Sequence, residues 1–211
     1  MKQTNYPLVY EDEKKRLYTK HENKYNYWDA YHSKAAAAIK KKIKNWPFKK
    51  DSKVLYLGAA EGTTISHLSS IIPKGIIIGV DISSNPFKKF LKLCEERNNI
   101  IPVLSDANHP ENYEKLIKQV GKIDVIYQDL AQKIQAGILI KNANLFLKKN
   151  GYVIYMVKAL SIDVTQKPSK TFKQEEDKLK KAGFEIIEKK SLKPFQKGHA
   201  VIIAKYNPIK K

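Results

Sequence analysis

The stretch Val54-Leu55-Tyr56-Leu57-Gly58-Ala59-Ala60-Glu61-Gly62-Thr63-Thr64 joins an apolar run, a loop with two glycines and the start of a helical pattern. The four apolar residues predict a buried strand, and the periodic residues 63–72 predict a helix. Glycines between a strand and a helix let the backbone turn sharply and approach a ligand. The helix start also offers unpaired N–H groups to a bound molecule. This unit therefore predicts an α/β sheet with a ligand site at the loop.

The rest of the chain continues the alternation of strands and helices. We expect further strands at 76–80, 101–104, 123–127 and 152–157, and helices at 86–97, 111–120, 134–146 and 171–182. Two strands at 184–190 and 200–205 follow without an intervening helix, which predicts a hairpin and one antiparallel strand in a mostly parallel sheet. This is the pattern of the Rossmann-like methyltransferases.

Two regions of different composition predict the domain organisation. We expect the Rossmann-like domain over residues 51–211. Residues 1–50 should form a small region that is β-rich over 1–33, where tyrosines and charged residues are frequent, and then a lead-in helix at 34–43.

Charge and cysteine content limit the function classes. The 211 residues contain 40 Lys+Arg and 21 Asp+Glu, a net charge of +19 that attracts polyanions such as RNA. A lysine-rich proteome would give the same excess, since Arg16 and Arg97 are the only arginines. The single cysteine, Cys94, lies on an apolar helical stripe and excludes an intrachain disulfide, which fits a cytoplasmic location. No apolar run reaches membrane-spanning length, so we expect neither a signal peptide nor a membrane partner.

Three acids follow successive predicted strands. Asp81 stands where an acid accepts hydrogen bonds from ribose hydroxyls, and Asp106 and Asp129 follow the next two strands at the same edge. A turn cap is the alternative interpretation of Asp106. The full G-x-G-x-x-G pattern is absent, and Glu61 would repel a pyrophosphate unless its side chain points to solvent. The set favours S-adenosylmethionine, which carries cationic groups and no phosphate, over a dinucleotide.

Five strings of this chain resemble the fibrillarin family, specifically the archaeal fibrillarin-like rRNA/tRNA 2′-O-methyltransferases. The similarity runs from about residue 25 to 206. Its landmarks are Tyr27-Trp28-Asp29-Ala30-Tyr31-His32-Ser33-Lys34, Gly58 to Thr64, Glu96-Arg97-Asn98-Asn99-Ile100-Ile101-Pro102, Asp124-Val125-Ile126-Tyr127-Gln128-Asp129-Leu130-Ala131-Gln132, and Lys158-Ala159-Leu160-Ser161-Ile162-Asp163. The family usually has Pro and Arg in place of Ala30 and His32, and Glu in place of Asp81. The N-terminal region is short for the family, which leaves its strand pairing open.

The resemblance implies a site for S-adenosylmethionine. The cofactor-binding residues it implies are Gly58, Ala59, Thr63, Thr64, Asp81, Ile82, Asp106, Ala107, Asp129, Leu130, Ala131 and Gln132. No metal is implied.

It also implies a catalytic set of Lys34, Asp129, Lys158 and His199. In this scheme Lys158 deprotonates the ribose hydroxyl, Asp129 orients its ammonium group, and Lys34 and His199 position the hydroxyl or a phosphate. A solvated helix lysine, a strand-end lysine and a turn histidine are the alternative interpretations of Lys34, Lys158 and His199.

The function implied is methyl transfer to ribose 2′-hydroxyls of rRNA, with tRNA as a second substrate class, within a box C/D guide ribonucleoprotein. The partners implied are the guide RNA and its target, a Nop-domain scaffold protein and a kink-turn-binding ribosomal-type protein. The scaffold should dock away from the cofactor edge, on part of residues 1–50 or on exposed apolar side chains. Two other functions stay open: a methyltransferase for a protein, a small molecule or an RNA base, and a non-catalytic basic RNA-binding module.

Overall fold

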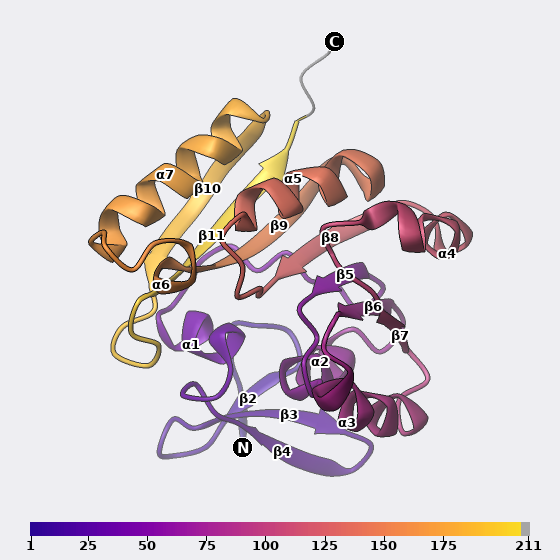
Figure 1. The fold of residues 1–211 in the computed structure, drawn as a ribbon. Helices are drawn as coiled ribbons and strands as arrows, with labels where there is room; N and C mark the ends of the chain where they lie inside the picture. The colour runs from indigo at the N-terminus through magenta and orange to yellow at the C-terminus, as the bar shows by residue number, and fades with distance from the viewer. Residues whose placement is uncertain (208–211) are drawn as a thin grey trace.

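The computed structural model describes residues 1–207 and contains two β-sheets (Figure 1). The large sheet has the order β10-β11-β9-β8-β5-β6-β7, and the small sheet has the order β1-β2-β3-β4. The strands of the large sheet are β5 (Lys53–Leu57), β6 (Ile76–Asp81), β7 (Ile100–Leu104), β8 (Ile123–Gln128), β9 (Leu147–Lys158), β10 (Phe184–Ser191) and β11 (His199–Tyr206). The strands of the small sheet are β1 (Lys2–Gln3), β2 (Val9–Glu11), β3 (Leu17–His21) and β4 (Lys24–Trp28). The helices are α1 (Lys34–Lys40), α2 (Thr63–Ile71), α3 (Ser84–Glu95), the 3-10 helix η1 (Pro110–Tyr113), α4 (Glu114–Val120), α5 (Gln135–Phe146), α6 (Ala159–Ile162) and α7 (Pro168–Lys181).

The topology of the large sheet confirms the Rossmann-like prediction. Strands β7, β6, β5, β8 and β9 are parallel, and β11 runs antiparallel to both of its neighbours, β9 and β10. From β5 the chain moves outward to β6 and β7, and it then returns to the other side of β5 to form β8. Open α/β sheets bind ligands at such a reversal, outside the carboxyl ends of the strands.

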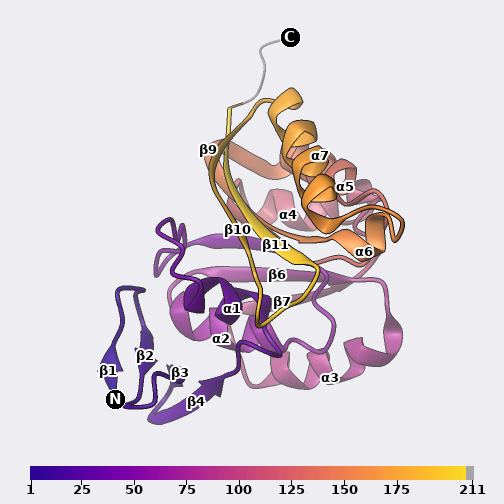
Figure 2. The ribbon, with the colours of Figure 1, turned by 90° about the vertical axis from the view of Figure 1, so that its left-hand side faces the viewer.

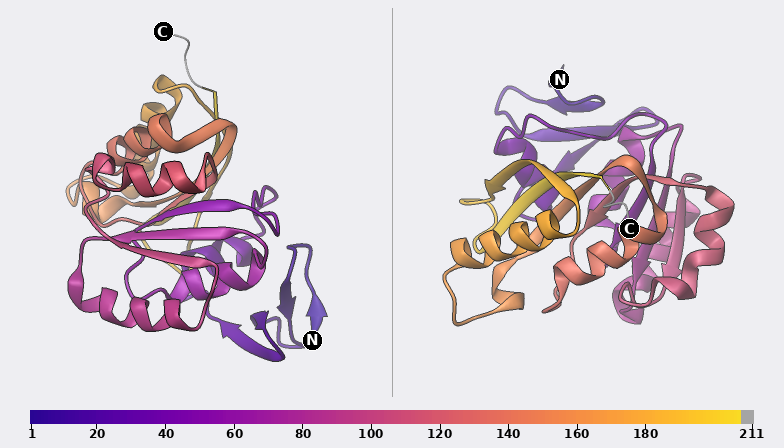
Figure 3. Two further views of the ribbon diagram at one scale, coloured as in Figure 1. Left: turned by 90° about the vertical axis from the view of Figure 1, so that its right-hand side faces the viewer. Right: turned by 90° about the horizontal axis from the view of Figure 1, so that it is seen from above.

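Alternating side chains of the central strands build two hydrophobic layers. Val54 and Tyr56 belong to one buried cluster, and Leu55 and Leu57 belong to the other. Helices α1, α2 and α3 cover the first face, while α4, α5 and α7 cover the second (Figures 1 and 3). Because both faces are covered, the central strands β5, β6 and β8 are mainly apolar, and we expect ligands to bind at the edge of the sheet.

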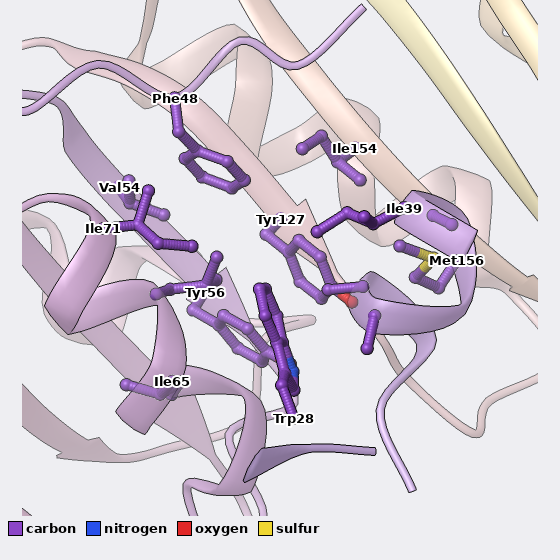
Figure 4. Close-up of a cluster of buried hydrophobic side chains, with 14 of the residues drawn as sticks. Trp28, Ile39, Phe48, Val54, Tyr56, Ile65, Ile71, Tyr127, Ile154 and Met156 are labelled. Atoms are coloured by element: carbon purple, nitrogen blue, oxygen red, sulfur yellow. The ribbon is translucent and has the colours of Figure 1, made fainter. Parts of the chain in front are cut away.

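The small N-terminal sheet packs on the helices that cover the first face of the large sheet (Figure 2). Val9, Leu17 and Trp28 share the buried cluster of Val54 and Tyr56, and Figure 4 shows Trp28 beside Tyr56 and Tyr127. All pairings in this sheet are antiparallel between successive strands. The β-rich prediction for residues 1–33 is therefore confirmed, and the pairing that the sequence left open is a simple meander.

Several predicted boundaries were wrong. The helix expected at 86–97 spans Ser84–Glu95, and Ser83 is its N-cap residue. The helix expected at 111–120 is divided into η1 and α4. The helix expected at 34–43 ends at Lys40, because Lys42 takes a left-handed conformation with a φ of 55°.

Two other predicted boundaries, the start of α7 and the start of β9, were also wrong, because hydrophobic periodicity does not locate the ends of elements. The helix expected from residue 171 begins at Pro168, whose fixed φ suits a first helical turn. Strand β9 begins five residues before the expected residue 152. The strand expected at 101–104 is β7, an edge strand, which explains why Pro102 is tolerated inside it.

Candidate active site

The loop after β5 lies against the end of β8. Gly58 has a φ of 93°, and a Cβ atom on it would lie 2.4 Å from the backbone oxygen of Asp129. The Asp129 N–H donates to the Leu57 oxygen at 2.9 Å, which joins the two strand ends. Gly62 also has a positive φ, 83°, and stands directly before Thr63 at the start of α2. Both glycines are required by geometry, since a side chain at either position would be strained.

Two of the predicted acids lie at the ends of β6 and β7. Asp81 accepts hydrogen bonds from the Ala60 N–H at 2.7 Å and from the Ser83 N–H at 2.8 Å. Asp106 accepts one from the Asn108 N–H at 2.8 Å, which is the turn contact that the sequence offered as an alternative. A carboxylate oxygen has more than one lone pair, so both acids keep acceptor capacity for a ligand.

Lys34, Asp129 and Lys158 meet in one cluster. The Lys34 Nζ lies 3.0 Å from Asp129 Oδ2, and the Lys158 Nζ lies 3.1 Å from Asp129 Oδ1. The side chains are 16%, 13% and 20% exposed for Lys34, Asp129 and Lys158 respectively, so the cluster is largely screened from bulk water while still reachable. Two lysines from distant segments thus share one carboxylate at the sheet reversal.

A buried polar relay fixes the position of Lys34. The Trp28 Nε1–H donates to Ser33 Oγ at 2.9 Å, and Ser33 Oγ lies 2.9 Å from Thr64 Oγ1 on α2. Ser33 is also the N-cap residue of α1, which places Lys34 at the first position of that helix. Trp28 and Ser33 lie within the fibrillarin-like string of residues 27–34, but the resemblance implies no role for either.

Gln135 fixes the backbone of Lys158. Its side-chain amide donates to the Lys158 oxygen at 3.3 Å, and its Oε1 accepts from the Lys158 N–H at 3.1 Å. Gln135 is fully buried, and its own backbone oxygen accepts from the Gln128 side chain at 2.8 Å. Sequence reasoning missed this residue, because a glutamine at the start of a predicted helix carries no signal of a tertiary partner.

His199 begins β11 and stands opposite Lys158 in the antiparallel ladder. Its Nδ1–H donates to the Lys197 oxygen at 2.7 Å, so Nε2 is the acceptor nitrogen of the neutral ring. Burial, with Lys34 and Lys158 nearby, lowers the pKa of His199 from its usual 6.5, against the opposing effects of the Lys197 hydrogen bond and Asp129. The geometry brings together all four predicted catalytic residues.

The remaining predicted cofactor residues line the same edge with different exposure. Ala59 and Thr64 are buried, Thr63 is exposed, and Ile82 is 58% exposed. Ala107 is buried, and its oxygen accepts from the Asn142 side chain at 2.9 Å. In the segment after β8, Leu130 packs partly against the second hydrophobic layer, Ala131 is exposed and Gln132 is half-buried.

The position of the Glu61 side chain does not support its use as a reason to prefer S-adenosylmethionine over a dinucleotide. It is about half exposed and forms an ion pair with the Lys89 Nζ at 2.8 Å on α3. Because its charge is already compensated, it gives little preference for a cationic ligand. Cys94 packs against the first hydrophobic layer, and burial raises its pKa to about 11, in agreement with a packing role.

The comparisons with known proteins decide the family. The family model described as Fibrillarin matches residues 4–208. The chain belongs to the fibrillarin family. A fibrillarin-like rRNA/tRNA 2′-O-methyltransferase of Methanocaldococcus jannaschii is 46% identical over 182 residues, which are 86% of this chain and 78% of the relative.

Two solved fibrillarin structures are similar over almost the whole chain. A fibrillarin/Nop5p complex contains a chain with a TM-score of 0.87 and 43% identity, covering 94% of this chain and 97% of the other. Aeropyrum pernix fibrillarin, in complex with natively bound S-adenosyl-L-methionine, has a TM-score of 0.82 and 39% identity, covering 93% and 92%. The Rossmann-like fold with its N-terminal sheet is therefore the fold of fibrillarins.

The departures from the fibrillarin pattern are accommodated locally. Ala30 is buried, and its oxygen accepts a hydrogen bond from the Gln196 side chain at 3.2 Å. His32 is exposed, with its Nδ1 2.7 Å from Asp29 Oδ2. Over residues 1–207 there is no cluster of three metal-ligating side chains and no helix long and apolar enough to cross a membrane.

Proposed function

We propose that the chain is an S-adenosylmethionine-dependent RNA 2′-O-methyltransferase. The observation that carries this proposal is the Lys34–Asp129–Lys158 cluster at the sheet reversal, with His199 beside it. The relatives support it: one is named as an rRNA/tRNA 2′-O-methyltransferase, and another is a fibrillarin with natively bound S-adenosyl-L-methionine. RNA fits the net charge of +19.

The residues at the edge fit this cofactor. Gly58 and Gly62 let the backbone come close to it, and Asp81 and Asp106 offer oriented carboxylates to its ribose and adenine groups. Ile82 offers an exposed apolar surface next to Asp81, and Asp129 would lie nearest its sulfonium group. When bound, the cofactor supplies an electrophilic methyl group.

The chain's own residues would prepare the ribose hydroxyl. Its oxygen would attack the methyl carbon that the bound cofactor supplies, with the displaced sulfur as the leaving group. The hydroxyl proton must leave as this happens, and the Lys158 Nζ, which lies beside Asp129, would accept it as a neutral amine. Asp129 orients Lys158, Lys34 would hold the hydroxyl oxygen or an adjacent phosphate, and the His199 Nε2 can accept a hydrogen bond from the hydroxyl, which keeps it in line.

A Nop-domain scaffold protein is part of the proposal, supported by the fibrillarin/Nop5p complex. Guide RNA of the box C/D type, target rRNA or tRNA and a kink-turn-binding protein extend it, because a basic surface gives affinity without choosing one nucleotide. A cytoplasmic location belongs to the same proposal.

Titration calorimetry tests the cofactor assignment. S-adenosylmethionine should bind, and NAD should bind more weakly or not at all. Asp81→Ala should weaken S-adenosylmethionine binding by about 1–3 kcal/mol, the scale of hydrogen bonds to a charged acceptor. Asp81→Asn keeps the size of the side chain and should change affinity in the same direction, whereas Asp51→Ala, at an exposed position outside the edge, should not. Equal or tighter NAD binding would reject the assignment.

A further inference from the structure

A basic groove lies between the N-terminal segment and the end of α1, apart from the cluster of Lys34, Asp129 and Lys158. Its volume is about 800 Å³, and part of its lining comes from residues 2–7 and 39–44. Its charged lining residues are Lys2, Lys15, Lys40, Lys42, Lys44 and a single acid, Glu11. We call this cavity the α1 groove. Five lysines against one carboxylate make it a strongly positive cavity.

The lysines of the α1 groove are not neutralised by neighbours. Within residues 1–207 none of the five forms an ion pair, although lysines elsewhere form many. The Lys40 Nζ donates to the backbone oxygen of Lys15 at 2.7 Å, which links α1 to the segment between β2 and β3 and leaves the charge of Lys40 in place. Placing like charges close together costs electrostatic free energy. A bound anion offsets this repulsion.

The loop after α1, which carries Lys42 and Lys44, is held by β10. Glu188 accepts hydrogen bonds from the Lys44 N–H at 2.8 Å and the Asn45 N–H at 3.0 Å. The Lys190 Nζ donates to the backbone oxygens of Lys41 at 3.1 Å and Lys42 at 2.5 Å. This wall of the groove is therefore preorganised, which lowers the entropy cost of binding.

Two aromatic side chains line the groove together with the lysines. Tyr6 and Trp46 form an edge-to-face pair with ring centroids 5.7 Å apart. The Tyr6 hydroxyl donates to the Ile43 oxygen at 2.7 Å, which fixes this ring against the loop. Aromatic rings beside a track of cations are the combination with which proteins bind single-stranded nucleic acid.

We propose that the α1 groove binds a single-stranded segment of RNA, as a second RNA contact in addition to the reacting nucleotide. This rests on the proposed function for the class of polyanion. Helix α1 connects the catalytic cluster to the α1 groove, because Lys34 is its first residue and Lys40, which lines the groove, is its last. At a rise of 1.5 Å per residue, the two ends are about 9 Å apart along the helix axis. One RNA strand held in the groove would restrain where a neighbouring ribose can lie.

Lys42 allows a test that does not disturb the fold. It is the residue after the C-cap of α1 and has a φ of 55°, at a position where glycine is the usual residue. Lys42→Gly removes the charge and also the backbone strain, so the melting temperature should stay equal or rise. A loss of RNA affinity in this variant is then not a loss of folding.

The experiment measures binding of a uridine-only RNA strand to the full chain as salt is varied. Lys42→Gly combined with Lys44→Ala should weaken binding on the order of tenfold near 0.1 M salt and lower the salt slope by roughly 1.4, as for two lost phosphate contacts. The matched control is the double variant Lys115→Ala with Lys149→Ala, at exposed lysines outside the groove. It should change the RNA affinity and the salt slope far less.

Trp46 supplies a direct readout of the site. The chain has two tryptophans, and Trp28 is almost completely buried, so RNA in the groove should change the emission of Trp46. Trp46→Phe should abolish this change. Equal effects of the groove and control pairs, or tighter binding of polyglutamate than of RNA, would overturn the proposal. If the wild type still transferred methyl groups when one of these results was obtained, only the proposal for the α1 groove would be rejected, and the proposed function would be retained.

Discussion

At the scale of the residue, Asp129 joins the two lysines of the site, because each of its carboxylate oxygens forms an ion pair with one of them. Asp129 and Lys158 could be found by placing them at strand ends, where parallel sheets bind ligands. Lys34 could be assigned only through the family resemblance, because α1 lies outside the repeating strand–helix pattern. Ser33 and Gln135, which position the two lysines, were beyond the sequence, because hydrogen bonds across 23 or more positions leave no local pattern.

Lys158→Ala should abolish methyl transfer and leave S-adenosylmethionine binding nearly unchanged, because Lys158 acts on the acceptor. A lost general base lowers rates by about 10²–10⁴. Asp129→Ala should abolish transfer and also weaken cofactor binding, since it faces both partners. Single-turnover rates on an RNA that the wild type accepts, together with calorimetry, measure these effects. Lys133→Ala, an exposed lysine near the same edge, serves as the control. A Lys158→Ala rate close to that of wild type would remove Lys158 from catalysis.

At the scale of the element, α2 connects the N-terminal sheet to the cofactor loop. His67 on α2 has its Nδ1 2.8 Å from Thr19 Oγ1 on β3, and its ring stacks on Trp28 at 4.9 Å between centroids. The order of strands and helices was predictable from periodicity. This contact was not, because it joins a helix histidine to a threonine 48 positions earlier.

The buried His67 should make stability depend on pH. Burial, with Arg97 nearby, lowers its pKa from 6.5 to about 4. The unfolded chain therefore binds a proton between these values that the folded chain does not, so stability is complete above pH 6.5 and falls as the pH drops toward 4. The loss amounts to about 3 kcal/mol, at 1.36 kcal/mol per pKa unit.

Urea unfolding at pH 7, 5.5 and 4.5 measures this dependence. His67→Phe keeps an aromatic ring against Trp28 but has no group that titrates. Its unfolding free energy should therefore fall less between pH 7 and pH 4.5 than that of the wild type, whatever its value at pH 7. His109→Phe, at an exposed position, should keep the slope of the wild type. A slope unchanged by His67→Phe would show that another group titrates.

At the scale of the whole molecule, the sequence predicted the sheet and its active edge but not the α1 groove. The two hydrophobic layers follow from alternation along each strand, which periodicity detects. The groove lies where residues 2–7 meet residues 39–44, and a single sequence gives no means of pairing such segments. The division of the chain at residues 50 and 51 and the cytoplasmic location stay predictions.

The last prediction concerns how one ribose is selected. The catalytic domain and its edge bind cofactor and a ribose, and a charge of +19 binds any RNA. Neither distinguishes one 2′-hydroxyl from thousands, so we expect the chain alone to methylate RNA poorly or without site preference. Methylation of one defined nucleotide should appear when a guide RNA, the Nop-domain scaffold and the kink-turn-binding protein are added, and it should move when the guide sequence is changed. Mapping ribose-methylated positions after each addition measures this. Lys158→Ala in the complete particle controls for contaminating activity. Efficient, site-specific methylation by the purified chain would place the selection within these 211 residues.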